Sequence, residues 1–524
     1  MPGFLTKPLG AALTIGIAVV GAAVAGVILF TSSRADEVNL TTAQLVPADA
    51  GVYFALNTDL TSEQWVATFS LVEKLGQENP EEELRDGAEE SGVDWENDVA
   101  PFLGGNAAVY VRGVDIENFD FSGSVIFRAH DAERVMEILE EQAGVWDEHT
   151  YEGIEYLELG LDGFAARLDE HVVIAYDEAS LFEVMDVHLG KTESLSGVDE
   201  FQQLRDELTK NFLAFAYISS ENMLGDFWLD DPVIRAALEE SGTGDMVFRP
   251  AAWVFGATDA GFEGQAASIG ESGVISPMLE PRESRFASLV PADSAMFFST
   301  TAIAQTWEQV VAGAGDQIDR AIAENSDGQY SSLDEALRDG GREIGLESVE
   351  QIIELFAGET AVAVWFPTGA YEDEEWVLLG EVDVAAARPI LEAVIDEVGV
   401  GTPEVRQVGG VEMIIAVDED GEPMAFAFKD DYVLLGTEAG LEAVLQLGSE
   451  PPLAALNRYA ETVDAMPTSL GTFMYFNMAT MLRLEEAGVV PQLDDAERVL
   501  EGLILNMVDE RGVVRASGVL TIGE

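Results

Sequence analysis

Short runs of apolar residues alternate along the chain with longer segments of helical periodicity. Runs such as Val52–Asn57, Ala107–Val111 and Val172–Tyr176 are rich in β-branched and aromatic residues, which favours strands. The segment Asp131–Ala143 places its apolar residues at helical spacing, and Asp131 is suited to cap the first turn. Several strands in succession, followed by helices, predict an α+β fold with a mainly antiparallel sheet.

This pattern occurs twice in the chain. Leu45–Asn57 reads LVPADAGVYFALN, and Leu289–Thr301 reads LVPADSAMFFSTT. Strand and helix patterns follow the two phrases in the same order, which is typical of a tandem duplication. We expect copy one over Leu45–Val274, a linker over Ile275–Ser288, and copy two over Leu289–Glu524, each copy being of single-domain size.

The N-terminal part carries an uncharged apolar run, Leu9–Phe30, long enough to cross a bilayer as a helix. Because Lys7 precedes the run, we expect a cytoplasmic N-terminus and a single pass. Residues 1–31 are then a cytoplasmic stub and transmembrane anchor, 32–44 a tether, and the bulk of the chain lies outside the cytoplasm at a bacterial cell membrane. The alternative is a signal peptide cleaved near Ala23–Ala25, where small residues suit a peptidase.

Small residues also recur at every fourth position of this apolar run, and such a stripe lets two membrane helices approach closely. The stripe, through which the chain could form a homo-oligomer, consists of Gly10, Thr14, Ala18, Ala22 and Gly26. The alternative is that a run so rich in Gly and Ala produces the spacing without function.

The composition excludes nucleic acid as a partner and excludes cysteine chemistry. The chain has 98 Asp and Glu against 26 Lys and Arg, a formal charge of −72, which repels nucleic acid. The acid excess indicates either a solvated surface in a salty medium or carboxylate clusters that collect divalent cations. Hydrophobic residues make up 48% of the chain, enough for substantial cores, and the absence of cysteine excludes disulfides and thiolate chemistry.

The sequence lacks the motifs that are typical of zinc sites, serine hydrolases and phosphate-binding loops. All histidines fall in copy one, none in a zinc-type spacing, and they are His130, His149, His171 and His188. The chain has no Gly-x-Ser-x-Gly elbow, and Gly190–Thr192 lacks the first glycine of a phosphate loop. We therefore predict no catalytic residue, cofactor site or metal site.

Aromatic residues are the remaining candidates for a functional site, because several of them recur at matching places in the two copies. These residues are Trp65, Trp307, Phe102, Phe356, Tyr217 and Tyr475. They indicate either core packing or an apolar groove between sheet and helices that accepts a lipid or a peptide.

The opening phrases Leu45–Asp49 and Leu289–Asp293, with the Phe-x-Gly turns at Phe102–Gly104 and Phe356–Gly358, resemble a bacterial family known only as domain of unknown function 3352. The resemblance covers the part of the chain after the apolar run. It implies a membrane-anchored bacterial protein and brings no catalytic residues with it.

The function we predict is non-enzymatic binding or scaffolding of an envelope component by a membrane-anchored, duplicated domain. Its partner could be an envelope protein, a peptide or a lipid. Two alternatives stay open. One is a carrier of an apolar ligand held between layers, and the other is a metal-assisted hydrolase that uses carboxylates.

Overall fold

The computed structural model describes residues 40–523 except 77–79, 91, 116–119, 144, 160–162, 220–221, 223–248, 271–272, 327–328, 371–372, 401, 418–422, 450 and 487–498. The chain divides into two compact units. Of the described residues, those up to Ile269 form unit 1 and those from Gly270 onward form unit 2.

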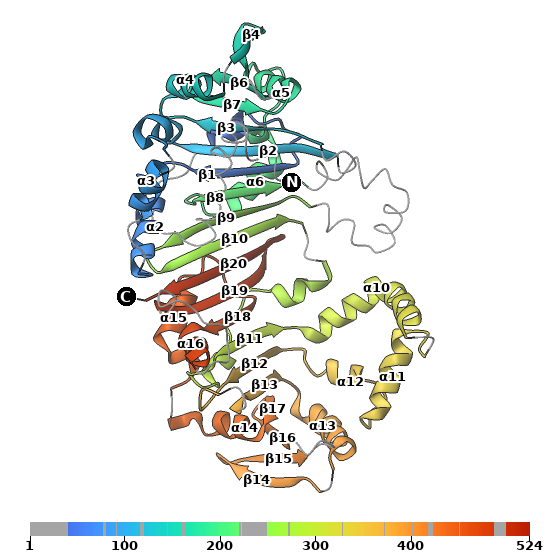
Figure 1. Ribbon diagram of the computed structural model, residues 1–524. Helices are drawn as coiled ribbons and strands as arrows, with labels where there is room; N and C mark the ends of the chain where they lie inside the picture. The colour runs from blue at the N-terminus through green and yellow to red at the C-terminus, as the bar shows by residue number, and fades with distance from the viewer. Residues whose placement is uncertain are drawn as a thin grey trace. The chain divides into compact units, whose positions relative to one another are not determined.

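The strands of unit 1 form one antiparallel sheet, in the spatial order β4-β5-β6-β7-β3-β2-β1-β8-β9-β10 (Figure 1). Along the chain they are β1 (Val52–Asn57), β2 (Asn106–Asp115), β3 (Asp120–Arg128), β4 (Val145–Tyr151), β5 (Ile154–Leu159), β6 (Gly163–Leu168), β7 (His171–Ala175), β8 (Ala214–Ile218), β9 (Ala251–Thr258) and β10 (Gly261–Ile269). The longer helices of this unit are α2 (Glu63–Lys74), α3 (Pro80–Glu90), α4 (Ala132–Ala143), α5 (Glu178–His188) and α6 (Asp199–Glu207). Short helical turns are η1 (Thr41–Gln44), η2 (Trp95–Val99), η3 (Ala100–Phe102) and η4 (Leu195–Gly197).

The strands of unit 2 are also antiparallel, in the order β14-β15-β16-β17-β13-β12-β11-β18-β19-β20. They are β11 (Met296–Thr301), β12 (Glu359–Trp365), β13 (Glu375–Glu381), β14 (Glu404–Val408), β15 (Val411–Val417), β16 (Pro423–Lys429), β17 (Tyr432–Thr437), β18 (Thr472–Asn477), β19 (Leu500–Glu510) and β20 (Val513–Ile522). The helices are α10 (Ile303–Asn325), α11 (Leu333–Glu343), α12 (Glu350–Ile353), α13 (Val384–Val398), α14 (Glu438–Leu445), α15 (Asn457–Asp464) and α16 (Met478–Glu486). Short turns are η5 (Gly273–Leu279), η6 (Phe286–Ser288), η8 (Leu447–Ser449) and η9 (Leu453–Ala455).

The two units share one strand order, because β1 to β10 and β11 to β20 take the same places in their sheets. The central strands β1 and β11 directly follow the two LVPAD phrases. Each phrase also reaches a distant turn in the same way, since Val46 O accepts from Leu195 N at 2.8 Å and Val290 O accepts from Leu453 N at 2.9 Å. The repeated sequence therefore forms an equivalent turn in each unit.

Local chemistry explains the hairpins at the far end of each sheet. Glu152 and Gly153 have φ angles of 50° and 91° in the turn between β4 and β5, and Gly409 and Gly410 have 58° and 82° between β14 and β15. Two consecutive positive φ angles match the twist of a two-residue antiparallel turn, and glycine adopts them without steric cost.

Helix starts are encoded by capping residues. Asp131 accepts from Arg134 N at 3.0 Å at the start of α4, as the sequence predicts, and the Asp383 side chain accepts from the first-turn amides of α13. Asp177 and Thr437 cap the equivalent helices α5 and α14.

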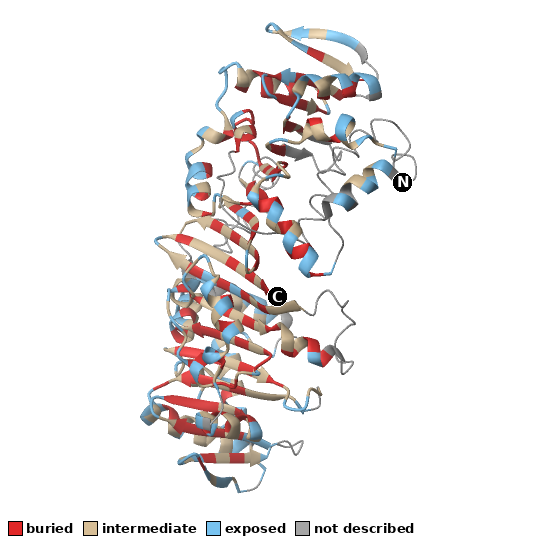
Figure 2. Ribbon diagram, turned by 90° about the vertical axis from the view of Figure 1, so that its left-hand side faces the viewer, coloured by how far each residue is buried: buried red, intermediate tan, exposed pale blue. Residues whose placement is uncertain are grey.

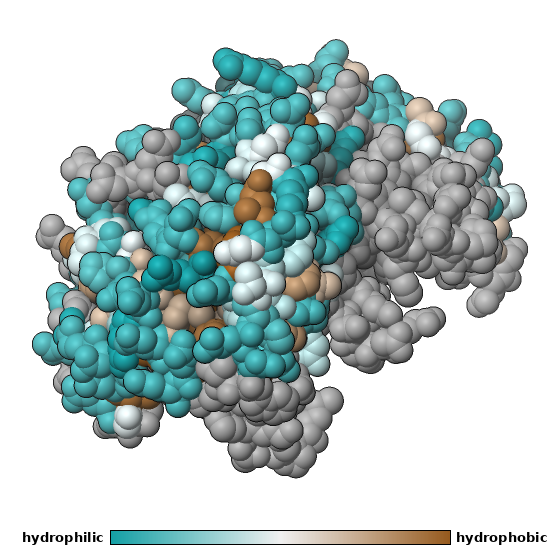
Figure 3. Space-filling model, turned by 90° about the horizontal axis from the view of Figure 1, so that it is seen from above, coloured by the Kyte–Doolittle hydropathy of each residue, from teal (hydrophilic) through white to brown (hydrophobic). Residues whose placement is uncertain are grey.

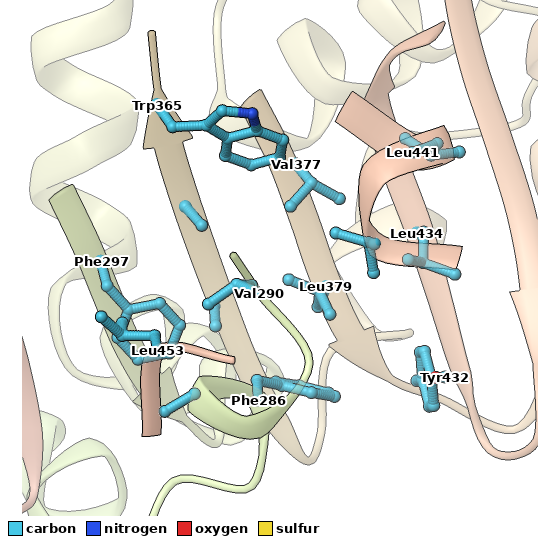
Figure 4. Close-up of a cluster of buried hydrophobic side chains, with 14 of the residues drawn as sticks. Phe286, Val290, Phe297, Trp365, Val377, Leu379, Tyr432, Leu434, Leu441 and Leu453 are labelled. Carbon is cyan, nitrogen blue, oxygen red and sulfur yellow. The ribbon is translucent and has the colours of Figure 1, made fainter. Parts of the chain in front are cut away.

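The largest described core of unit 2 lies between its sheet and the helices α14 and α15. Figure 4 shows Phe297, Trp365, Val377 and Leu379 pointing from neighbouring strands into this cluster, and Phe286 lies among them with no exposed surface. Buried and less buried residues alternate along the strands (Figure 2), as expected for strands whose two faces have different environments. A second cluster on the opposite face packs α13 against Phe426 and Phe428, so helices cover both faces here.

The predicted fold class is wrong in its transmembrane helix. Among the helices of the described residues, none is long and apolar enough to cross a membrane. The longest of them, α10, carries Glu308, Asp316, Asp319, Arg320 and Glu324, and such charges oppose insertion into hydrocarbon. The predicted span Leu9–Phe30 and its stripe of small residues lie outside the described residues.

The segment 275–288, which we expected to link the copies, contributes a buried ion pair to unit 2. Arg282 Nη1 lies 3.1 Å from Glu359 Oε1, with 16% and 7% of the two side chains exposed. Glu359 also accepts from Ser299 Oγ at 2.9 Å and from Arg285 N at 3.1 Å. This segment is therefore packed as part of unit 2.

Among the residues whose burial the structure describes, Glu359 is the one buried Asp or Glu. In the view of Figure 3 the described residues present a mostly hydrophilic surface with scattered apolar side chains. The described acids are therefore mostly in contact with solvent, as the solvated-surface interpretation of the acid excess requires.

Candidate binding pocket

Two of the four histidines, His149 and His171, form side-chain hydrogen bonds within unit 1. His171 is buried on β7, where its Nε2 lies 3.1 Å from Thr41 Oγ1, and burial lowers its pKa. His149 Nε2 lies 3.1 Å from Glu158 Oε2 on the neighbouring strand. In the described part of the chain, no three His, Asp or Glu side chains are grouped as metal ligands.

The recurring aromatic residues pack against apolar neighbours. Trp65 donates from Nε1 to Asn57 O at 2.8 Å in a core beneath α2. Phe102 and Phe356 pack against apolar clusters of their own units. Trp307, the counterpart of Trp65, is half-buried, and its Nε1 has no hydrogen-bond partner in the described structure. These contacts favour core packing over a groove.

A cavity of about 470 Å³ lies in unit 2 where α15 begins. Its walls combine small apolar side chains with charged groups, and the residues are Ala292, Pro451, Ala455, Leu456, Asn457, Arg458, Glu461 and Glu501. They come from the LVPAD turn of copy two, from η9 and the first turns of α15, and from β19. Small-ligand sites typically have volumes of ~300–1,000 Å³.

Backbone hydrogen bonds position the walls of this cavity. Pro291 and Pro452 form an isolated β-bridge, which holds the LVPAD turn against η9. The chain then turns into α15, whose first helical bond runs from Ala460 N to Leu456 O at 3.1 Å. No side chain caps this helix start, so its first amides are left for another acceptor.

Arg458 is the cation of the cavity. Its Nη1 lies 3.5 Å from Asn477 Oδ1, and Arg458 forms no ion pair with any described residue. The residue stands in the first turn of α15, where a positive charge opposes the helix dipole at a cost of about 0.3–1 kcal/mol. Since no described carboxylate pairs with it, this cation is available to an anionic group of a ligand.

Comparison of the two units shows that this charge is specific to copy two. Phe201 packs edge-on against Tyr217 with ring centroids 5.2 Å apart, and Tyr459 packs in the same way against Tyr475 at 5.0 Å. The residue before each of these helical aromatics is Glu200 in copy one and Arg458 in copy two. Glu200 suits the helix dipole, so the arginine is a departure from what the fold prefers.

Tyr475 packs against Tyr459, the residue that follows Arg458 in α15. Its side chain has no exposed surface, and its hydroxyl has no hydrogen-bond partner in the described structure. Burial raises the pKa of Tyr475, while Arg458 lowers it and Glu501 raises it, so the hydroxyl lies within the electrostatic reach of both charges. Tyr475 is not among the residues that line the cavity, so its hydroxyl belongs to the core beneath α15.

The sequence did not point to Arg458, Glu461 or Glu501 as site residues, and Ala292 was identified only as part of the LVPAD phrase. The walls come from segments near residues 292, 458 and 501, and only folding brings them together. The available signal was the residue before the helical aromatic, which is Glu200 in copy one and Arg458 in copy two.

A family model described as "Protein of unknown function (DUF3352)" matches residues 11–503, which confirms the predicted resemblance. No curated protein matches the chain. A solved structure, titled "Structure of crystal form I of TP0453", is similar at 9% sequence identity with a TM-score of 0.23, over 45% of this chain and 81% of that chain.

Proposed function

The chain belongs to this family of proteins of unknown function, and we propose that it is a non-enzymatic protein that binds a component of the bacterial envelope outside the cytoplasm. The observation that carries the proposal is the cavity at α15, whose wall holds Arg458, an arginine without an ion pair among the described residues. The placement outside the cytoplasm is part of this proposal, and it rests on the position of Lys7 before the apolar run Leu9–Phe30.

The chemistry of the cavity supports binding more than catalysis. Arg458 is permanently charged and serves as neither nucleophile nor general base. The two carboxylates of the wall are Glu461 and Glu501, and neither has a histidine or a hydroxyl nucleophile among the lining residues. These groups hold a polar ligand by charge and hydrogen bonds.

The alternative of an apolar-ligand carrier fits this cavity less well. Three of its lining residues are charged, and burying charges against hydrocarbon without compensation is costly. A lipid chain would leave Arg458 and both glutamates unpaired.

Native mass spectrometry of the purified chain tests the proposal. The protein is incubated with peptide and lipid fractions of bacterial envelopes, and Arg458→Gln is treated in parallel. We expect a small polar species retained by the wild type and lost from the variant. Retention of no species would contradict the proposal, and equal retention of a lipid by both proteins would favour the carrier.

A further inference from the structure

The cavity at α15 is lined by charges of both signs, and this restricts the charges that a bound ligand can carry. A ligand that is only anionic meets Arg458 but also Glu461 and Glu501, and a ligand that is only cationic meets Arg458. Like charges placed together without screening are unfavourable. A ligand that carries both signs avoids both conflicts.

We propose that this cavity binds a zwitterionic ligand of the amino-acid or short-peptide class; this inference rests on the proposed binding function. The ligand carboxylate lies against Arg458 and the uncapped amides of α15, and its ammonium group lies against Glu461 and Glu501. Guanidinium and helix N-terminal amides are the donors that carboxylates prefer.

Two further properties of the cavity, its small apolar walls and its net charge, indicate which amino acids or peptides fit it best. Ala292, Pro451, Ala455 and Leu456 give the cavity small apolar walls, which suit a small side chain such as that of alanine. The lining groups carry one positive and two negative charges, so a ligand with a second ammonium group compensates them better than a ligand with one. A lysine-containing dipeptide has this charge pattern.

The cation is a property of copy two alone. Copy one carries Glu200 at the position of Arg458, so its equivalent helix start does not offer the carboxylate-binding group. The inference therefore predicts one ligand per chain.

The test measures dipeptide binding to the full chain by isothermal titration calorimetry. The probes are Lys-Ala, Ala-Ala, N-acetyl-Ala-Ala without an ammonium group, and Ala-Ala-amide without a carboxylate. We expect Lys-Ala to bind with a stoichiometry of one and more tightly than Ala-Ala, and both capped peptides to bind at least about tenfold more weakly than Ala-Ala.

Variants identify the site. Arg458→Gln should weaken Ala-Ala at least about tenfold and abolish the preference for Ala-Ala over its amide, and Glu501→Gln should reduce the preference for a free amine. Arg338→Gln is the matched control, since it removes an exposed arginine of α11 that pairs with Asp334, and it should bind like the wild type. Circular dichroism verifies that each variant is folded.

Equal binding of free and capped peptides, or unchanged binding by Arg458→Gln, would overturn the inference. If no dipeptide binds while native mass spectrometry still finds a species that depends on Arg458, the zwitterion assignment fails and the binding function stands. If neither experiment finds a ligand, both fail.

Discussion

The buried ion pair of unit 2 gives a stability prediction whose size follows from its geometry. Arg282 and Glu359 expose only 16% and 7% of their side chains, and their closest atoms lie 3.1 Å apart. The variant Glu359→Gln keeps the shape of the side chain and removes its charge. The guanidinium of Arg282 then remains buried without a counter-charge.

Breaking a buried ion pair from one side costs ~3–5 kcal/mol. Because Arg282 keeps some contact with solvent and its bond to Ser299 Oγ at 3.0 Å, we expect the low end of this range, about 3 kcal/mol. At 1.4 kcal/mol per factor of ten, this corresponds to a roughly hundredfold increase in the fraction of open molecules.

The pair itself is poorly aligned, which yields a second expectation. The Nη1 of Arg282 makes no hydrogen bond despite its short distance to Glu359, and its Nε is buried without a partner in the described structure. Replacing both residues, as in Arg282→Met with Glu359→Leu, should therefore cost less than the single change.

The assay is urea denaturation of the full chain followed by circular dichroism, with hydrogen-exchange mass spectrometry of β12 to assign the change to unit 2. The exposed pair of Arg128 and Glu170 in unit 1 is the control, and Glu170→Gln should cost at most about 1 kcal/mol. A wild-type unfolding midpoint for Glu359→Gln, or a double variant as unstable as the single one, would refute the reasoning.

Three further predictions concern substitutions of single residues. Tyr475→Phe removes a buried hydroxyl without a partner, so it should raise the free energy of unfolding by about 1 kcal/mol, and a lower thermal midpoint would contradict this. Gly123→Ala places a Cβ 2.2 Å from Tyr110 O and should cost about 1–3 kcal/mol, whereas Gly264→Ala, whose nearest atom lies at 3.9 Å, should cost less. Burial lowers the pKa of His171, so the unfolded chain binds that proton more readily and stability is lost as pH falls below about 6.5; in His171→Gln the unfolding midpoint should depend less on pH between about 7 and 5.

Much of the fold was predictable because it depends on local patterns. The strand run Val52–Asn57 and the capped helix after Asp131 were identified from alternation, helical spacing and capping chemistry. The pairing of β3 with β7 joins segments far apart in the chain, and no local pattern specifies it. Repetition of the whole order in copy two was the strongest long-range signal.

The cavity at α15, in contrast to the strands and helices, could not be predicted from local sequence patterns. Arg458 and Glu501 are each unremarkable in sequence, since one lies in a short helix and the other at a strand start, and Ala292 stands out only as part of the LVPAD phrase. Their significance depends on distances that only the folded chain defines. The packing of the Pro-containing segment 275–288 likewise depends on the folded chain, where Phe286 of this segment is fully buried.

The strand order also has a consequence for solubility. Within the described residues, β4 and β14 each pair on one side only, so each presents a free row of backbone donors and acceptors. Open edges of this kind are templates for aggregation unless charges guard them. Asp147 and Glu148 lie on the first edge, and Glu404 lies on the second, held by Arg406 at 2.9 Å. Two such proteins that meet edge to edge bring like charges together, so the acids of this chain also act as a barrier to polymerisation.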